Sequence, residues 1–204
     1  MADDVRPGPH LVLVGLMGAG KTSVGRRLAK KLGLRHVDLD HAVERAAGCT
    51  IPEIFAAQGE SAFRDREHDL LVELLAGDRP VVLSTGGGAV LREDNRSAMR
   101  ARATVVWLRA RPETLLARVG DGSGRPLLAG DPLGNLTRLA AERAAAYEAA
   151  AHVIVDVDGL PFDAITERVA RHAPVPAGRP AAGAAQAAPT APTDRNGPVR
   201  GVRP

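Results

Sequence analysis

Residues 15–22 have the residue types and the spacing of a phosphate-binding loop. They read GLMGAGKT and fit the pattern G-x-x-x-x-G-K-[ST] without a mismatch, between a short apolar run and an amphipathic stretch. In such a loop the glycines allow backbone N–H groups to point at phosphate oxygens, and the following helix N-terminus adds partial positive charge. Lys21 would reach the β- and γ-phosphates, and the Thr22 hydroxyl would be a ligand of Mg²⁺. The segment therefore predicts binding of a nucleoside triphosphate together with Mg²⁺.

Two aspartates lie at the end of the second apolar run. Asp38 and Asp40 are separated by one leucine, and strand alternation would place them on opposite faces of a sheet. One of them could hold Mg²⁺ through water, while the other accepts a proton from an attacking hydroxyl group. Equally, the pair could cap a helix over residues 41–47. The spacing alone leaves both interpretations open.

Two glycine-rich segments are candidates for ligand contact. Gly86, Gly87 and Gly88 follow a third apolar run, and successive glycines at a strand end allow a ligand to approach the backbone closely. Arg125 lies in a second segment, residues 120–131, which contains four glycines. A loop of this composition that carries an arginine is typical of a lid that closes over a nucleotide and excludes water.

Arg64 and Arg143 each lie in a stretch with helical periodicity. Glu67 follows Arg64 by three residues and could pair with it, and Tyr147 follows Arg143 by four residues. Arginines on helices are most often solvated, so the spacing alone favours a solvated position for both arginines.

These candidates are distributed over segments in which strand-like and helix-like patterns alternate. Short apolar runs predict strands at residues 10–15, 36–39, 81–84, 104–108 and 152–155. Amphipathic periodicity and capping signals predict one helix that begins after Thr50 and others at residues 21–32, 60–75, 112–118, 135–151 and 161–172. The alternation predicts an α/β fold with a mostly parallel sheet and helices on both faces, with the site at the carboxyl ends of the strands.

Composition and charge argue against several other classes of protein. The net charge is +3, and residues 173–204 hold four arginines against one aspartate, so residues 1–172 are neutral overall. A neutral body with 2% aromatic residues argues against nucleic-acid binding. No apolar run reaches the roughly 18 residues of a membrane helix, and the first residues lack the apolar core of a secretory signal. The single cysteine fits a reducing, cytoplasmic location.

The two ends of the chain differ from its middle. Residues 173–204 are rich in Ala, Pro and Gly and lack aromatic residues, Leu, Ile and Met, so they cannot bury enough apolar surface to offset the entropy of ordering. We therefore expect an N-terminal extension at residues 1–9, a folded domain at 10–172 and a disordered tail at 173–204.

In combination, these motifs resemble those of the shikimate kinases. The resemblance covers about residues 10–171 and rests on GLMGAGKT, the Asp-Leu-Asp after the second strand, FAAQGESAFRDRE, STGGGAV, RPLLAGDP and ERAAAYEAAA. It implies a three-layer α/β/α P-loop fold of the nucleoside-monophosphate-kinase type, with a five-stranded parallel sheet of order 2-3-1-4-5 and a mobile lid at about residues 119–131. It also implies a monomer that phosphorylates the 3-hydroxyl group of shikimate with ATP, a step toward chorismate and the aromatic amino acids.

The resemblance assigns roles in acceptor binding to individual residues. Asp40 matches the aspartate that binds the reacting hydroxyl group and acts as the base. Arg64 and Arg143 match the pair that binds the substrate carboxylate, for which arginine is suited by its bidentate geometry. The middle one of the three glycines, Gly87, matches a backbone contact to the substrate, and its two neighbours shape the turn.

The resemblance also implies a set of nucleotide contacts. Asp38 matches the aspartate that contacts Mg²⁺ through water, Arg118 an arginine close to the adenine, and Arg125 a lid arginine over the phosphates. The residues implied in ATP binding are Gly18, Ala19, Gly20, Lys21, Thr22, Ser23, Arg118 and Arg125. The chain departs from the family at residues 156–161, where a basic residue often packs on the adenine and this sequence has none.

Two other functions are compatible with the phosphate-binding loop. Another small-metabolite kinase of the same fold, such as one that acts on gluconate, would share the loop and the lid. A non-catalytic nucleotide switch would hydrolyse ATP slowly and would present an apolar surface to a partner. The combination of Arg64, Arg143 and the glycine run favours a cyclic acid as the substrate.

Overall fold

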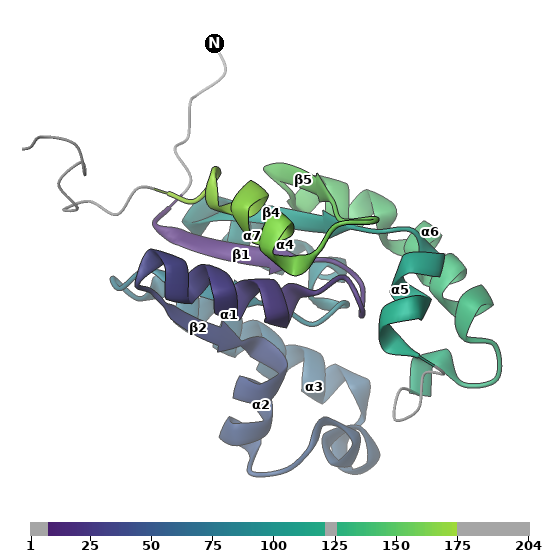
Figure 1. Ribbon diagram of the computed structural model, residues 1–204. Helices are drawn as coiled ribbons and strands as arrows, with labels where there is room; N and C mark the ends of the chain where they lie inside the picture. The colour runs from purple at the N-terminus through teal and green to yellow at the C-terminus, as the bar shows by residue number, and fades with distance from the viewer. Residues whose placement is uncertain (1–7, 121–125, 175–204) are drawn as a thin grey trace, which may run out of the picture.

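Five parallel strands form one sheet in the computed structural model, which describes residues 8–120 and 126–174 (Figure 1). The strand order is β2-β3-β1-β4-β5, which confirms the predicted order. The strands are β1 (His10–Val14), β2 (Arg35–Asp38), β3 (Val81–Ser84), β4 (Ala103–Arg109) and β5 (Val153–Asp156).

The central strand, β1, is buried along its whole length. It pairs with β3 on one side and with β4 on the other, and Leu11 stands opposite Val82 and Thr104. A continuous apolar run without polar alternation is typical of a parallel strand that is covered on both faces. The phosphate-binding loop leaves the end of this strand, so its position is fixed by the core of the sheet.

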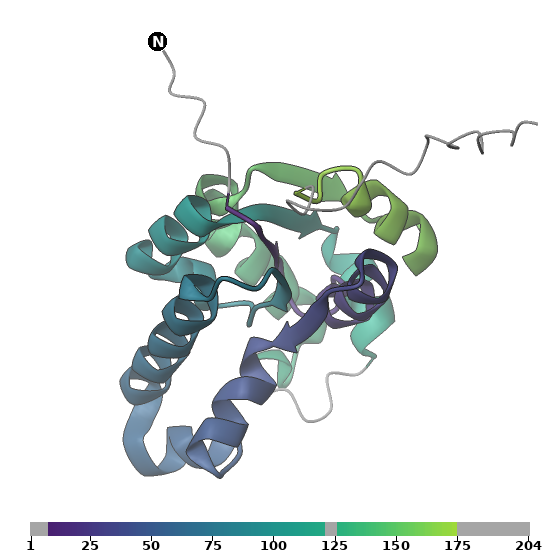
Figure 2. The same ribbon diagram turned by 90° about the vertical axis from the view of Figure 1, so that its left-hand side faces the viewer.

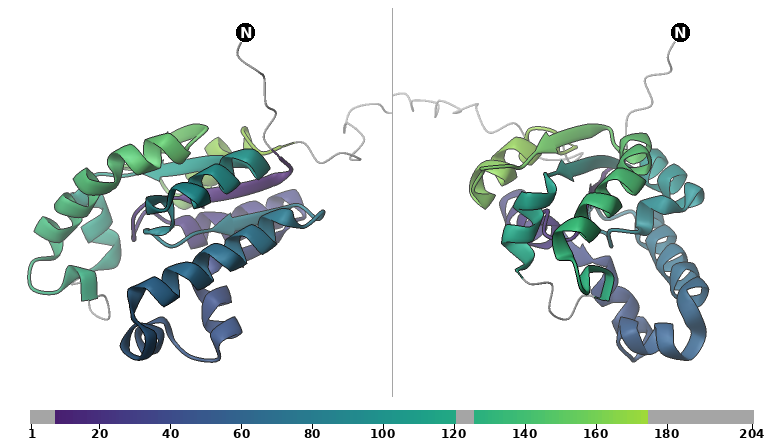
Figure 3. Two further views of the ribbon diagram at one scale, coloured as in Figure 1. Left: turned by 180° about the vertical axis from the view of Figure 1, so that it is seen from behind. Right: turned by 90° about the vertical axis from the view of Figure 1, so that its right-hand side faces the viewer.

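Helices cover both faces of the sheet, which confirms the three-layer architecture (Figures 1 and 3). The pair α1 and α7 packs on one face, and α4 and α6 pack on the other together with the second part of α3. The helices are α1 (Lys21–Leu32), α2 (Leu39–Ala47), α3 (Ile51–Ala76), α4 (Glu93–Arg102), α5 (Pro112–Val119), α6 (Pro132–Ala150) and α7 (Phe162–Ala170), with short 3₁₀ turns η1 (Ala89–Leu91) and η2 (Pro126–Leu128).

The α2 helix and the first part of α3 project from the end of β2 as an arm (Figure 2). Val43 and Ile54 of this arm form a small apolar cluster with Phe63, which lies further along α3, and this cluster is separate from the main core. Thr50 caps α3 as predicted, because its hydroxyl accepts from the N–H of Glu53 and the Glu53 carboxylate accepts from the N–H of Thr50. The arm therefore has an apolar cluster of its own, and it holds α3 beside the carboxyl ends of the strands.

Some helix boundaries differ from the sequence-based expectation. The two helices expected from Thr50 and over 60–75 form the single helix α3, which is kinked at Gly59, where φ is 81°. The α2 helix begins at Leu39 instead of residue 41. The α4 helix was not predicted, because its polar sequence buries only Asn95 and Met99 and therefore lacks a clear apolar stripe.

Parts of the predicted domain organisation lie outside the described residues. Because the structure describes no residue before 8 or after 174, it does not cover most of the extension at 1–9 or most of the tail at 173–204. Within the proposed lid at 119–131, residues 121–125 are likewise not covered. These boundaries therefore stay predictions. Among the described helices, none combines the length and the apolar character needed to cross a membrane.

Candidate active site

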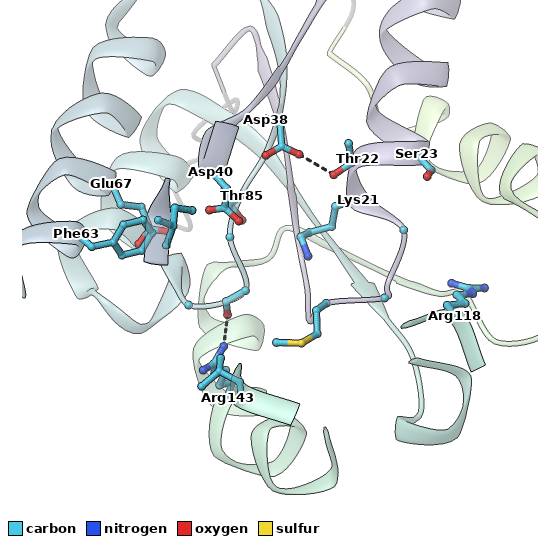
Figure 4. Close-up of a pocket in the computed structure, with 18 of the residues that line it drawn as sticks. Lys21, Thr22, Ser23, Asp38, Asp40, Phe63, Glu67, Thr85, Arg118 and Arg143 are labelled. Atoms are coloured by element: carbon cyan, nitrogen blue, oxygen red, sulfur yellow. Dashed lines mark hydrogen bonds between the residues drawn. The ribbon is translucent and has the colours of Figure 1, made fainter. Parts of the chain in front are cut away.

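The predicted site residues meet in one cavity of about 470 Å³ beyond the carboxyl ends of the central strands (Figure 4). Most of them lie on its wall: Gly18, Gly20, Lys21, Thr22, Ser23, Asp38, Asp40, Arg64, Gly86, Gly87, Gly88, Arg118 and Arg143. Ala19 is the exception within the loop, since its side chain is fully buried and does not line the cavity. Arg125 lies outside the described residues.

The phosphate-binding loop connects β1 to the first turn of α1. Gly20 precedes α1 with φ of 96°, a left-handed conformation, and no side chain caps the helix there. A Cβ atom on Gly20 would lie 2.7 Å from the Phe162 ring, so glycine is required by both conformation and space. The Lys21 ammonium group donates to the carbonyl oxygens of Gly15 at 2.8 Å and of Leu16 at 2.9 Å. The loop thus presents an uncapped helix N-terminus and an ammonium group to the cavity.

Thr22 and Asp38 join α1 to β2 inside this cavity. The Thr22 hydroxyl donates to Oδ2 of Asp38 at 2.7 Å, as the dashed line in Figure 4 shows. The other carboxylate oxygen of Asp38 accepts from the N–H of His41 and caps α2. The helix-cap interpretation is therefore confirmed for Asp38, and the same side chain also contacts the phosphate-binding loop.

This pair of oxygen donors fits Mg²⁺. The ion prefers oxygen ligands, keeps several waters, and binds through one or two protein groups together with substrate phosphates. Within residues 8–120 and 126–174, no group of three or more His, Cys, Asp and Glu side chains could enclose a metal ion. A hydroxyl and a carboxylate beside a phosphate-binding loop suit a nucleotide-bound cation and do not form an independent metal site.

Asp40 lies in the first turn of α2, and its carboxylate lines the same cavity as that of Asp38. The expectation that the two aspartates face opposite sides of the sheet is wrong, because strand alternation ends where α2 begins at Leu39. Burial raises the pKa of Asp40, and the charge of Asp38 raises it further, whereas Lys21 and Arg64 act in the opposite direction. Asp40 is therefore a more basic carboxylate than an exposed one, as a proton acceptor needs to be.

Arg64 lies on α3 beside the glycine turn and forms an ion pair within the cavity wall. Its guanidinium donates to Oε2 of Glu67 at 2.8 Å and to Glu60 at 3.1 Å. Glu67 is completely buried, and its second oxygen has no hydrogen-bond partner among the described residues. A Cβ atom on Gly86 would lie 2.9 Å from that oxygen and 2.6 Å from Oδ1 of Asp40. The sequence indicated Glu67 only as a partner of Arg64, and the structure places it on the cavity wall as well.

Arg143 is 8% exposed, so the interpretation of a solvated arginine is wrong. The main body of α6 packs across the sheet and carries this side chain to the glycine turn, where it donates to the carbonyl oxygen of Gly87 at 2.9 Å (Figure 4). Arg64 is also partly buried, with 25% of its side chain exposed. Both guanidinium groups therefore line the cavity from different helices, Arg143 beside Gly87 and Arg64 beside Gly88.

Arg118 and Phe162 form the opposite end of the cavity. The Arg118 guanidinium donates to the carbonyl oxygens of Ala19 at 3.3 Å and Val157 at 3.0 Å, and it lies 5.5 Å from the centre of the Phe162 ring. Phe162 stands directly after the segment that lacks a basic residue. The sequence contained no signal for this aromatic residue, because only the close packing of α7 against the loop brings its ring to the cavity.

Comparison with known proteins agrees with this geometry. Residues 17–173 match the family model for shikimate kinase. The chain is 54% identical over 152 residues to a shikimate kinase from Symbiobacterium thermophilum, an alignment that covers 73% of this chain and 87% of the relative. It is 47% identical over 161 residues to a shikimate kinase from Nitrobacter winogradskyi, with 78% and 74% covered.

A solved structure leads to the same family. The chain superposes with a TM-score of 0.76 on a shikimate kinase from Acinetobacter baumannii in complex with shikimate, at 38% identity, and the match covers 81% of this chain and 92% of the other. The resemblance found in the motifs is thus confirmed over most of the chain: this protein belongs to the shikimate kinase family.

Proposed function

We propose that the chain transfers the γ-phosphoryl group of ATP to the 3-hydroxyl group of shikimate and releases ADP and shikimate 3-phosphate. The observation that carries this proposal is the meeting, in one cavity, of a phosphate-binding loop, a basic carboxylate and two arginines on separate helices. A phosphate loop alone would serve many kinases. The two arginines beside the glycine turn add a site for a carboxylate, which suits a small cyclic acid.

At the nucleotide end, the loop residues 18–23 would hold the phosphates of ATP, and Arg118 beside Phe162 would face the base. Lys21 would turn from the loop carbonyls to the transferred phosphoryl group and neutralise its charge. Thr22 and, through water, Asp38 would hold Mg²⁺, which when bound neutralises charge on the phosphate oxygens. We place Arg125 over the phosphates from the family resemblance alone.

At the acceptor end, Arg64 and Arg143 would bind the carboxylate of shikimate, with Gly87 and its two neighbours as the backbone contact. Asp40 would orient the 3-hydroxyl group and accept its proton as the new O–P bond forms. Because phosphoryl transfer needs little covalent chemistry from the protein, most of the rate should come from alignment and charge neutralisation. From the family resemblance we also propose that the chain acts as a monomer, and ATP as the co-substrate suits a cytoplasmic reaction.

The experiment that tests this function measures ADP release by the purified protein with ATP and Mg²⁺. Shikimate, gluconate, quinate and no acceptor are compared, for the native chain and for Asp40→Asn. We expect release that depends on shikimate and falls by about 10²-fold or more in the variant, as for loss of a general base. ADP release with gluconate would show that the chain acts on another class of substrate. ADP release that depends on no acceptor would support a nucleotide switch.

A further inference from the structure

The Tyr147 hydroxyl group contacts the glycine turn, although Tyr147 is not among the residues of the cavity wall. This side chain lies on α6 one turn after Arg143 and is 1% exposed. Its hydroxyl donates to the carbonyl oxygen of Gly87 at 2.7 Å, and Arg143 donates to the same oxygen at 2.9 Å. The Tyr147 ring stacks on Trp107 of β4, with the ring centres 5.3 Å apart. One carbonyl oxygen thus receives two donors from a single, well-packed helix.

The neighbouring carbonyl groups of the turn are occupied in the same way. The oxygen of Gly86 accepts from the N–H of Ala89 at 3.3 Å, and that of Gly88 accepts from the N–H of Leu91 at 3.0 Å. Asn95 donates to the oxygen of Ala89 at 2.9 Å. No hydrogen bond within the described part of the chain uses the N–H groups of residues 86–88. The carbonyl oxygens of this turn are therefore paired with donors from the protein, and the N–H groups of residues 86–88 are available to a ligand.

The Gly87–Gly88 peptide is the weakest point of this arrangement. Neither flanking residue has a side chain that restricts rotation, and the C=O and N–H of a trans peptide point in opposite directions. If the Gly87 oxygen lost its donors, the peptide could rotate and exchange the places of its carbonyl and its N–H. A carbonyl oxygen that turned toward the cavity in this way would repel an anionic ligand.

We propose that Tyr147 is a positioning residue for the phosphoryl acceptor, which by holding the Gly87 carbonyl oxygen fixes both the adjoining peptide and the Arg143 guanidinium in the arrangement that receives a carboxylate. This inference rests on the proposed function, because it concerns the shikimate end of the same cavity. The phenol needs to stay protonated for this role, and because burial raises its pKa it remains a donor at neutral pH.

Tyr147→Phe removes the hydroxyl and keeps the ring that packs on Trp107. We expect the dissociation constant of shikimate, measured by calorimetry, and its KM to rise about fivefold, which corresponds to the loss of one ordinary hydrogen bond. The KM for ATP should stay unchanged, because within the described residues the Tyr147 hydroxyl bonds to Gly87, at the proposed acceptor end. Thr137→Val is the matched control, since it removes another hydroxyl from α6, one that is exposed and donates to Leu133 within the helix.

The outcomes separate a positioning role from a purely structural one. Weaker shikimate binding with unchanged KM for ATP and an unchanged Thr137→Val variant supports the proposal. Unaltered shikimate binding in Tyr147→Phe, or an equal loss for shikimate and ATP together with a lower melting temperature, overturns it. If the native chain itself shows no shikimate-dependent ADP release, the proposed function fails instead, so the two failures are distinguishable.

Discussion

The Thr22 hydroxyl donates a 2.7 Å hydrogen bond to Asp38, and this contact joins the first turn of α1 to the end of β2. Asp38 uses its other carboxylate oxygen to cap α2, where Asp40 lies in the first turn. The sides of the cavity that we propose for the cation and for the acceptor are therefore connected through one carboxylate. Substitution of Asp38 should weaken metal binding before it disturbs the capping of α2. The cap needs only an oxygen atom as acceptor, whereas a bound cation also benefits from the negative charge.

Asp38→Asn tests this division. The amide oxygen can still cap α2, but the charge beside Thr22 is lost, so the Mg²⁺ concentration for half-maximal ADP release should rise about tenfold or more. Asp163→Asn is the control, because that exposed carboxylate pairs with Arg27 and does not line the cavity. A variant with unchanged Mg²⁺ dependence would contradict the assignment of Asp38 to the metal.

Lys21→Ala should lower kcat by about 10²-fold or more for every acceptor alike, because the lost charge acts on the phosphoryl group and not on the acceptor. The measurement compares the native-to-variant ratio of kcat for shikimate with the ratio for any slow alternative acceptor. Lys31→Ala, which removes an exposed lysine paired with Glu167, serves as the control. Ratios that differ strongly between acceptors would place Lys21 at the acceptor end instead.

Removal of either arginine should weaken shikimate binding and leave ATP binding nearly unchanged. A charge-assisted, bidentate contact is worth about 1.5–3 kcal/mol, so Arg143→Ala should raise the KM for shikimate by roughly 10- to 100-fold. Arg138→Ala, which removes an exposed arginine from the same helix, should change neither constant. An effect of Arg143→Ala on ATP alone would show that the carboxylate site lies elsewhere.

Arg64→Ala should also destabilise the fold, because it leaves the fully buried Glu67 without its ion-pair partner. Burial already raises the pKa of Glu67, and Arg64 is the main group that opposes this shift. Adding Glu67→Gln should therefore restore much of the melting temperature lost in Arg64→Ala, but not the affinity for shikimate. If the double variant melts no higher than Arg64→Ala, the unpaired carboxylate is not the cause of the instability.

Much of the fold follows from local patterns in the sequence. The apolar runs that become β1 and β3 are short and continuous, each begins after a proline, and glycine follows β1 directly and β3 after one residue. The loop between β1 and α1 is recognisable from its residue spacing. The α4 helix escaped prediction because it buries almost nothing of its own and is held by packing against α3, α6 and β4. Its existence depends on tertiary context, which periodicity does not report.

Site residues could be predicted where they lie close together in the sequence with a characteristic spacing. They could not be predicted from spacing where packing brings distant segments together. The loop residues around Lys21 are recognisable by themselves, whereas the burial of Arg143 depends on how α6 crosses the sheet to reach Gly87. Helical spacing alone favoured a solvated arginine, and only the family resemblance indicated otherwise. For Phe162 neither source gave a signal, because its ring reaches the cavity through the packing of α7 beside Gly20.

The stability of the fold should decrease in mild acid, and His10 is one cause. This side chain at the start of β1 is 1% exposed, and its Nδ1 has no partner among the described residues. Burial lowers the pKa of His10 from 6.5, and the charge of Arg102 adds to the shift, while carbonyl groups of Gly77 and Leu75 oppose it. At pH values between the lowered pKa and 6.5 the unfolded chain binds a proton that the folded chain does not, so stability falls as the pH drops below 6.5.

Thermal melting at pH 8.0 and pH 5.5 measures this effect, at about 2–4 °C for each kcal/mol lost in a chain of this size. His10→Leu removes the buried titrating group, so its melting temperature should fall less between the two pH values than that of the native chain. Some pH dependence should remain, because burial also lowers the pKa of His36 and of His152. His172→Asn, at an exposed position after α7, should match the native chain; an identical fall in His10→Leu would mean that His10 does not carry the acid sensitivity.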